Sequence, residues 1–410
     1  MVERLSIARL GARGDGVADT PAGTLYVPYT LPGEIAEVDQ WPGHADRRHL
    51  IKVDSASPDR IAPICPHFGT CGGCALQHLE ANAYLAWKRE LVVAALRSRG
   101  LDAEVDAVRP VPLGSRRRAA LALGRGTEGL ALGYRRARLH ELIDVDICPI
   151  LSPRIVARLP KLKRALAPLL GGKREARVSL TETEGGLDIV LEGVRPSPAA
   201  LGAFAGKAAA LGVARLTLEG ESIGSVVAPR IDLSGAEVRL PPGAFLQASR
   251  EAEATLAELV RDGAQGVKHL ADLFAGLGTF TFALARDAAV DAYEADAAAL
   301  AALAEAARKT PRLKPVRGIV RDLFRVPLGV KELKAYDAVV FDPPRAGAAA
   351  QAEALAKSAV PKLVAVSCNP GTLARDLRIL VDGGYRIARV TPVDQFLFSA
   401  PVEVVAHLER

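Results

Sequence analysis

The chain has 410 residues, of which 49% are apolar and 24% charged, and its formal net charge is +6 at pH 7. This length exceeds what one hydrophobic core usually serves, so two or three domains are expected, and the composition argues against a largely disordered chain. The sequence begins with charged residues and holds no apolar run long enough to cross a bilayer, so we expect a cytoplasmic protein that does not span a membrane.

Residues 1–60 have the pattern of a small β module, because short apolar runs alternate with Gly, Pro and Asp turn signals. After a cysteine-rich segment, a helix is expected over residues 79–99, and Gly100 would end it. Residues 61–240 mix helical and strand patterns and form the expected central domain. No obligate protein partner is evident from the sequence.

The cysteine-rich segment has the spacing C-x5-C-x2-C, and a fourth cysteine stands far downstream. Without a secretory signal, such cysteines favour metal-binding or catalytic use over a disulfide framework. Four thiolates can hold either zinc or a [4Fe-4S] cluster, and three close ligands with one distant ligand is the commoner arrangement for a cluster. Gly72 and Gly73 would allow the tight turn that a ligand loop needs. The expected metal ligands are Cys65, Cys71, Cys74 and Cys148.

Three groups of basic residues precede the C-terminal region. They are Arg116-Arg117-Arg118, Arg135-Arg136 with Arg138, and Lys161 with Lys163-Arg164. Their charge would attract a phosphate backbone, so a nucleic-acid partner is one interpretation. An equally good interpretation is that each group is an ordinary solvated surface.

After residue 240 apolar runs alternate with amphipathic helical patterns, which is typical of a parallel α/β sheet. We expect a catalytic domain over residues 241–410. Its strands are predicted near residues 268–274, 289–294, 315–319, 336–342 and 362–367. Two final strands, near residues 385–393 and 402–408, are expected to pair antiparallel.

A glycine-rich turn follows the first of these strands, and it includes Gly276 and Gly278. Such a turn lets the backbone approach a nucleotide cofactor, and Glu294 at the end of the next strand could accept both ribose hydroxyls. These features fit NAD as well as S-adenosylmethionine. Thr281 stands where a dinucleotide motif would place its last glycine, which favours S-adenosylmethionine. The alternative is that the glycines only make a turn.

Two further acids support the same interpretation. Asp272 lies in the strand end that a methionine ammonium could face, and Asp322 follows the third strand, where an acid could meet the adenine amine. Together with the turn, we expect cofactor contacts from Phe274, Gly276, Glu294 and Asp322.

Cys368 follows the predicted strand 362–367, so we expect it at the carboxyl edge of the sheet, where open α/β folds bind ligands. Asp342 and Arg345 follow the preceding strand to the same edge. C5 of uracil becomes nucleophilic only after a thiolate adds to C6, and a base must later remove the C5 hydrogen. Cys368 would supply that thiolate and Glu403 that base. The alternatives are a buried packing cysteine and a surface carboxylate.

These motifs together resemble the bacterial RNA uridine C5-methyltransferase family, in particular its iron–sulfur branch that acts on 23S ribosomal RNA. The resemblance covers essentially the whole chain. It implies a class I S-adenosylmethionine-dependent methyltransferase fold with a seven-stranded Rossmann-like α/β sheet. It also implies a TRAM-type, OB-like β-barrel over residues 1–60 and a central α+β iron–sulfur domain over residues 61–240. S-adenosylmethionine and a [4Fe-4S] cluster would be the cofactors, and RNA the partner.

The resemblance further implies roles for single residues. Gln247 matches a glutamine that contacts S-adenosylmethionine, and Gly276 and Asp342 match the cofactor loop and the DPPR motif. Cys368 matches the nucleophile and Glu403 matches the base.

Two positions depart from the pattern of that family. Ser249 stands where an asparagine is expected, and Pro401 stands where a histidine usually precedes Val-Glu. Pro401 lies two residues before Glu403 and therefore bears on how that carboxylate is presented.

Three other functions remain open from the sequence. The first is a transfer-RNA uridine methyltransferase with the same chemistry, against which the cysteine set weighs. The second is a non-catalytic RNA-binding factor with a decayed methyltransferase domain. The third is an NAD-dependent oxidoreductase that carries an iron–sulfur centre.

Overall fold

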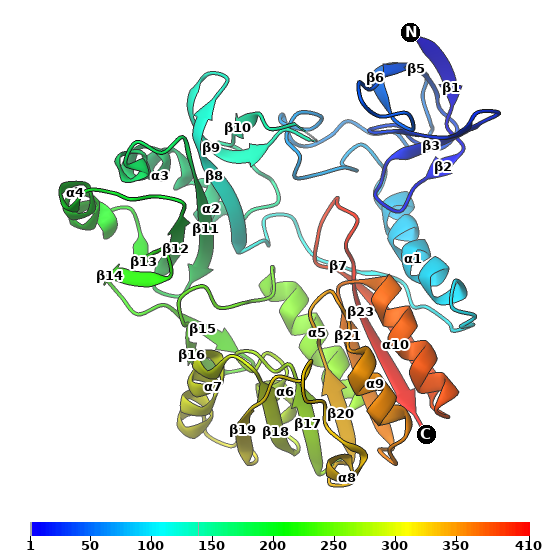
Figure 1. Cartoon of the computed structure of the whole chain (residues 1–410), viewed down its shortest axis with the longest axis vertical. Coiled ribbons are helices and arrows are strands. Elements are labelled where there is room, and N and C mark those ends of the chain that lie inside the picture. Colours follow the sequence, from blue (N-terminus) through cyan, green and yellow to red (C-terminus); the bar gives the residue numbers. More distant parts are fainter. Residues whose placement is uncertain (1, 138) are drawn as a thin grey trace.

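The chain is described by a computed structural model that covers residues 2–137 and 139–410 (Figure 1). Arg138, a member of one basic group, lies outside these residues. An N-terminal β unit lies at the upper right of Figure 1, a central sheet with its helices at the upper left, and the catalytic sheet below both. No helix within the described ranges is both long and apolar enough to span a membrane.

The N-terminal unit consists of two three-stranded antiparallel sheets, ordered β1-β5-β6 and β2-β3-β4. A single bridge between Tyr26 and Arg47 joins them, and a small apolar cluster that includes Val27 and Val38 lies between them. The predicted β module is therefore present, while its membership of the TRAM class stays a prediction. The strands are β1 (Glu3–Ser6), β2 (Arg9–Leu10), β3 (Gly16–Thr20), β4 (Gly23–Val27), β5 (Ile35–Gln40) and β6 (Arg48–Ser55).

The central unit is a seven-stranded sheet of order β10-β9-β8-β11-β12-β13-β14. Only β12 and β13 pair in parallel among the described strands of this sheet, with α4 between them in the sequence. Helices α3 and α4 share an apolar cluster with β8, β11 and β12. The elements are β8 (Arg118–Gly126), β9 (Gly129–Arg135), β10 (Leu142–Asp144), α2 (Pro153–Val156), α3 (Leu159–Leu166), the 3-10 helix η1 (Ala167–Leu170), β11 (Glu175–Thr183), β12 (Gly186–Glu192), α4 (Pro198–Ala208), β13 (Val213–Leu218) and β14 (Glu221–Ser225).

The catalytic unit contains an eight-stranded sheet of order β19-β18-β17-β20-β21-β23-β22-β7, in which β7 is Arg109–Pro110, and a separate antiparallel pair of strands, β15 and β16. Strands β17 to β21 are parallel, and β23 lies antiparallel between β21 and β22. The elements are β15 (Arg230–Leu233), β16 (Ala236–Arg239), α5 (Arg250–Gly263), β17 (His269–Leu273), α6 (Thr281–Leu284), β18 (Ala289–Glu294), α7 (Ala297–Lys309), β19 (Val316–Val320), α8 (Val330–Leu333), β20 (Ala338–Phe341), α9 (Ala349–Ala356), β21 (Lys362–Ser367), α10 (Pro370–Asp382), β22 (Arg386–Asp394) and β23 (Glu403–Glu409).

The predicted strands of this sheet are confirmed to within about two residues, and so is the final antiparallel pair. The expectation of seven strands was wrong, because β7 (Arg109–Pro110) pairs with β22 as an eighth. Such a short segment with a proline carries no apolar run, so its pairing leaves no signal in the sequence.

Helix α1 (Ala81–Arg97) confirms the expected helix at residues 79–99. The Glu80 side chain caps its first turn by accepting the amides of Asn82 and Ala83. The apolar side of α1 packs against α10 and β22 of the catalytic sheet, with Val92 and Leu96 buried in the same cluster as the catalytic strands. The domain boundaries at residues 60 and 240 stay a prediction. Helix α1 falls within the expected central domain, yet it packs against the catalytic sheet.

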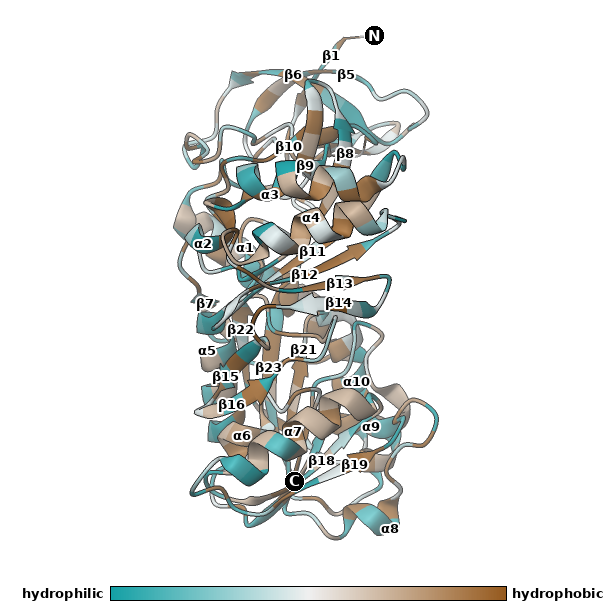
Figure 2. Cartoon of the chain, turned by 90° about the vertical axis from the view of Figure 1, so that its left-hand side faces the viewer, coloured by the Kyte–Doolittle hydropathy of each residue, from teal (hydrophilic) through white to brown (hydrophobic). Residues whose placement is uncertain are grey.

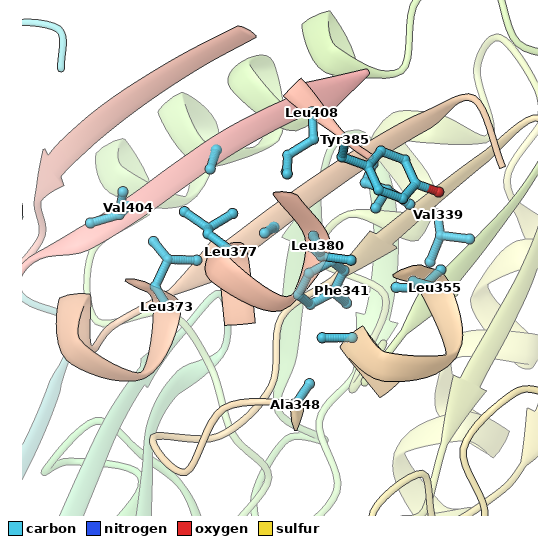
Figure 3. Packing of buried hydrophobic residues seen from close by; sticks show 14 of the residues in the cluster. Val339, Phe341, Ala348, Leu355, Leu373, Leu377, Leu380, Tyr385, Val404 and Leu408 are labelled. Carbon is cyan, nitrogen blue, oxygen red and sulfur yellow. The ribbon is translucent and has the colours of Figure 1, made fainter. Parts of the chain in front are cut away.

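Apolar strands flanked by amphipathic helices account for the stability of the catalytic unit. In Figure 2, β21 and β23 are mostly apolar, whereas the helices around them carry both polar and apolar residues. Figure 3 shows side chains of α9 and α10, among them Leu355, Leu373 and Leu377, packed against Phe341 and Val404 of the sheet. Burial of apolar side chains is the main favourable contribution to folding. In this unit it fixes the strand ends at which the site residues lie.

Candidate active site

The candidate site lies at one edge of the catalytic sheet. The carboxyl ends of β17, β18, β20, β21 and β22 meet there, and the antiparallel strand β23 begins there. All the catalytic and cofactor residues expected from the sequence lie at or beside this edge. They are Gln247, Phe274, Gly276, Glu294, Asp322, Asp342, Cys368 and Glu403.

The glycine turn after β17 leaves open space on one side. Phe274 and Gly278 adopt φ angles of 63° and 94°, and a Cβ at Gly278 would come within 2.6 Å of the Phe282 ring. A Cβ at Gly276 would meet nothing within 4 Å. The amide of Gly276 donates to Glu294 Oε2 at 3.0 Å, which fixes that carboxylate beside the turn. The close approach of a ligand to the backbone is therefore possible at Gly276.

Asp272 has an unused buried oxygen at the base of this turn. Its Oδ2 accepts the Thr281 hydroxyl at 2.5 Å, while Oδ1 is buried with no hydrogen-bond partner among the described residues. Burial is the main cause that raises the pKa of Asp272 to about 7. An uncompensated buried acceptor is costly unless a ligand supplies a donor. A ligand ammonium would supply both the donor and the opposite charge.

Asp322 lies on a short loop after β19, and backbone amides of the same loop hold its carboxylate in place. Its Oδ1 accepts the amides of Phe324 at 3.0 Å and Arg325 at 3.3 Å. The Phe324 ring lies 5.4 Å from the ring of Phe274, centroid to centroid, and is 52% exposed. The predicted adenine-binding acid therefore stands beside an aromatic pair that borders the glycine turn.

A chain of side-chain hydrogen bonds runs from Asp342 to Glu403. Gln247 Nε2 lies 3.5 Å from Asp342 Oδ2, at the limit of a hydrogen bond. Gln395 Nε2 donates to Gln247 Oε1 at 2.8 Å and to Glu403 Oε1 at 3.0 Å, while its Oε1 accepts the amide of Ala248 at 2.7 Å. Gln395 therefore connects the cofactor side of the site to the expected base.

Cys368 and Glu403 flank the last pair of the β21–β23 ladder. Ser367, the last residue of β21, pairs with Val404, so that Cys368, which follows Ser367, and Glu403, which precedes Val404, lie at the same end of the two strands, and the Glu403 charge acts on the Cys368 thiol. This register brings together a thiol and a carboxylate that are 35 residues apart in the sequence (403 − 368).

Burial dominates the acid–base properties of these groups. It is the largest effect that raises the pKa of the Cys368 thiol, with the Glu403 charge next, while Arg345 acts oppositely through a hydrogen bond and its charge. Burial and the Asp342 charge raise the pKa of Glu403 to about 8. Burial and the Asp272 charge raise the pKa of Asp342 to about 7. Several carboxyls with raised pKa values at one edge are typical of a functional site.

The other four cysteines line one cavity of about 110 Å³. The amide of Cys65 is bound by Gln77 Oε1 at 3.1 Å, and burial raises the pKa of the Cys74 thiol to about 12. In the part of the chain that the structure describes, no three His, Cys, Asp or Glu side chains are grouped as closely as metal ligands. The structure therefore brings Cys65, Cys71, Cys74 and Cys148 to the same cavity.

Several residues of the basic groups form ion pairs with acidic side chains of the same chain. Arg117 is 2% exposed, and its guanidinium binds Glu253 and the carbonyl of Gln247. Its interpretation as part of a phosphate-binding cluster was wrong, because burial removes it from solvent. Lys163 pairs with Asp144. A further two pairs join Arg135 to Glu175 and Arg136 to Glu141.

Known proteins resemble this chain over nearly its whole length. A chain from Rhizobium meliloti described as an uncharacterized RNA methyltransferase is 48% identical over 99% of both chains. The 23S rRNA (uracil(1939)-C(5))-methyltransferase RlmD of Chromohalobacter salexigens is 35% identical over 99% of this chain and 89% of its own. The family model for tRNA (Uracil-5-)-methyltransferase matches residues 230–410.

The chain belongs to the RNA uracil-5-methyltransferase family. The crystal structure of Pyrococcus abyssi tRNA (uracil-54, C5)-methyltransferase in complex with S-adenosyl-L-homocysteine covers 99% of this chain at 25% identity, with a TM-score of 0.76. The predicted class I methyltransferase fold is thereby confirmed, and the enzyme is an S-adenosylmethionine-dependent RNA uracil methyltransferase. The oxidoreductase interpretation is set aside.

Sequence reasoning did not assign Gln395 to the site of this methyltransferase. Its contacts join residues 148 positions apart, so no local pattern marks it. The available signal was a polar Asp394-Gln395 pair directly after the apolar Val393, at the end of the last strand but one. Arg345 was placed at the rim but not assigned to the thiol that it contacts.

Proposed function

We propose that the enzyme methylates C5 of a uridine in 23S ribosomal RNA, with Cys368 as nucleophile and Glu403 as base. The observation that carries the proposal is that Cys368 and Glu403 both flank the Ser367–Val404 pair, at the edge of the sheet where the glycine turn lies. Both groups are needed only if the reaction passes through a covalent adduct at C6.

The cofactor residues fit S-adenosylmethionine. The unpaired Oδ1 of Asp272 suits its ammonium, Glu294 suits its ribose, and Asp322 suits its adenine amine. When bound, S-adenosylmethionine supplies the electrophilic methyl group. Asp342 and Gln247 border the same space and would orient the donor relative to the uracil.

The protein residues would then act in order. The Cys368 thiolate, stabilised by Arg345, adds to C6, and the electrons of the C5–C6 double bond move into the ring carbonyl as an enolate. C5 would then form a bond to the methyl carbon while the bond between that carbon and the sulfonium sulfur breaks, so that the sulfur keeps the electron pair and S-adenosylhomocysteine is left. Glu403 removes the C5 proton, the double bond re-forms, and the Cys368 sulfur leaves C6. The product is methylated uracil with the thiolate restored and one proton on Glu403.

A basic cavity beside this edge suits the RNA. About 250 Å³ in volume, it is lined by Arg118, Arg177 and the 69% exposed ring of Phe245, and it reaches Gln395. The Arg118 guanidinium lies 5.1 Å from the Phe245 ring centroid. Positive charge beside an exposed aromatic ring is the combination that binds unstacked nucleotides. A uridine must leave its stack before a thiolate can reach C6.

The choice of ribosomal RNA rests on the relative named for 23S rRNA, which matches over nearly the full chain, and on the four cysteines. Transfer RNA is the second candidate, because both the family model and the archaeal structure carry that substrate in their names.

We also propose that Cys65, Cys71, Cys74 and Cys148 hold a [4Fe-4S] cluster. Four thiols at one cavity are a complete donor set, although the described side chains are not grouped at ligand distances. The cluster would tie the cysteine loop to the strand β10 region and take no part in methyl transfer. Anaerobic purification should give a brown protein with iron and sulfide, and stoichiometric zinc in a colourless protein would contradict the proposal.

Covalent trapping tests the methylation proposal. Protein and S-adenosylmethionine are mixed with 5-fluorouridine-substituted fragments of 23S ribosomal RNA, since fluorine at C5 blocks the final elimination. An adduct mapped to Cys368 by peptide mass spectrometry is expected. An adduct with transfer RNA alone would keep the mechanism and change the substrate. No adduct with either RNA would overturn the covalent mechanism.

A further inference from the structure

The loop between β22 and β23, residues 395–402, carries Gln395 at its start and leads into Glu403 at its end. The loop therefore borders the expected base on one side, while pairing with Val393 in the β22–β23 ladder holds its backbone on the other. The contacts of this loop come mainly from a distant part of the sequence, helix α1 and the residues after Cys74.

Lys88 of α1 is fully buried and holds both sides of this loop. Its ammonium lies 2.8 Å from Asp394 Oδ1 and donates to the carbonyls of Phe396 at 3.2 Å and Pro401 at 2.5 Å. Of the three N–H donors of the ammonium, two are used by these carbonyls, and the Asp394 carboxylate beside it balances its charge. Since Pro401 has no N–H of its own, its carbonyl is the backbone group at this position that can anchor the residue before Val402-Glu403.

Tyr84, one turn earlier on α1, holds the middle of the loop. Its hydroxyl donates to Asp394 Oδ2 at 2.7 Å and accepts the amide of Phe398 at 2.8 Å. The carbonyl of Phe398 in turn accepts the amides of Ala75 at 2.8 Å and Leu76 at 3.2 Å. Phe398 adopts a positive φ of 56°, a conformation that non-glycine residues keep only where contacts impose it.

From these contacts we infer that Lys88, together with Tyr84, is a positioning residue for Glu403, acting through the β22–β23 loop. The inference rests on the proposed role of Glu403 as base. Cys368 directly follows β21 and lies outside the loop, so removal of Lys88 should slow loss of the C5 proton more than formation of the adduct. Buried acceptors left without their donor would draw the loop toward water.

The test combines a structural and a kinetic measurement on the full chain. Lys88→Met removes the charge and all donors, Lys88→Gln keeps a neutral donor, and Tyr84→Phe removes one hydroxyl with little change of shape. Arg89→Met is the matched control, because exposed Arg89 lies on the same helix and binds the carbonyl of Val105 instead of the loop.

Hydrogen–deuterium exchange reports the loop directly. Peptides that cover residues 394–403 should exchange faster in Lys88→Met and Tyr84→Phe than in the parent, and Arg89→Met should leave them unchanged. Unchanged exchange in both variants would overturn the inference. This readout needs no RNA, so it stands apart from the proposed reaction.

Tritium release from C5-tritiated 23S ribosomal RNA reports the base step. In Lys88→Met release should fall by about tenfold or more while the covalent adduct accumulates and S-adenosylhomocysteine affinity is kept, and Lys88→Gln should recover part of the rate. Equal slowing of adduct formation and release would show a merely structural role and contradict the inference. If the parent enzyme releases no tritium, the proposed function fails, and the exchange result alone decides the role of Lys88.

Discussion

Gln395 donates one side-chain amide group to Glu403 at 3.0 Å and to Gln247 at 2.8 Å. The same group thus touches the expected base and a residue of the cofactor side. A single side chain in this position can couple the orientation of the base to the orientation of the methyl donor.

Gln395→Leu should slow turnover and shift its pH dependence. The hydrogen bond from Gln395 lowers the pKa of Glu403, which stands at about 8, so its loss should raise that pKa and move the rate increase to higher pH. A rate profile over pH 6–10 measures this. The exposed Gln265→Leu serves as control, and an unchanged profile would remove Gln395 from the site.

Cys368→Ala should abolish turnover and adduct formation and leave cofactor binding intact. Cys368 contributes the sulfur that bonds to C6, whereas the glycine turn and Asp272 lie on other strands. Activity is measured by methyl incorporation and binding by calorimetry with S-adenosylhomocysteine. Residual methylation at the parent rate would exclude the covalent route.

Glu403→Gln should accumulate the protein–RNA adduct, because no base would remove the C5 proton. The Glu403 charge raises the pKa of the Cys368 thiol, so the variant should also form its adduct at lower pH than the parent. Arg345→Gln should shift adduct formation in the opposite direction, because Arg345 lowers that pKa. Gel-shift trapping across pH measures both, and a shift of the same sign in the two variants would contradict the assignment.

Asp272→Asn should abolish a proton release that accompanies cofactor binding. The pKa of Asp272 is raised to about 7 in the free protein, and an ammonium beside it would lower that pKa, so binding near pH 7 releases a proton. For the same reason affinity in the parent should fall as pH drops below 7. Calorimetry with S-adenosylhomocysteine in two buffers of different ionisation enthalpy counts the proton. Asp272→Asn should also lose about 2 kcal/mol, roughly thirtyfold in affinity.

Arg117→Met should destabilise the protein by about 3–5 kcal/mol, because it leaves Glu253 buried without its partner. A second change, Glu253→Leu, should restore most of that stability. The control is Arg177→Met, whose pair with Glu192 is exposed and worth less than about 1 kcal/mol. Urea unfolding measures the stability of each variant, and a small effect of Arg117→Met would contradict the buried ion pair between Arg117 and Glu253.

Local sequence patterns predicted most of the fold of the catalytic unit and part of the candidate site. Apolar runs located the parallel strands, and a short motif at each strand end placed Asp342 and Cys368 at one edge, because parallel strands end together. Gln395 and Lys88 could not be assigned from the sequence, because their contacts join residues that are 148 and 313 positions apart. Arg117 showed the opposite failure: a run of arginines looks solvated in the sequence, and only the packing reveals a buried ion pair.

The packing of α1 against α10 and β22, and the pairing of β7 with β22, affect how the chain folds during synthesis. Val105 bridges to Val390, 285 residues later (390 − 105), and β7 pairs with β22, so the early segment is synthesised long before its partners. Until the last strands leave the ribosome, the side of α1 that packs against the catalytic sheet and the ammonium of Lys88 stay exposed to solvent. We expect a chaperone to bind this segment during synthesis. A fragment that begins at residue 241 would inherit the converse defect, with α10 exposed where α1 should pack.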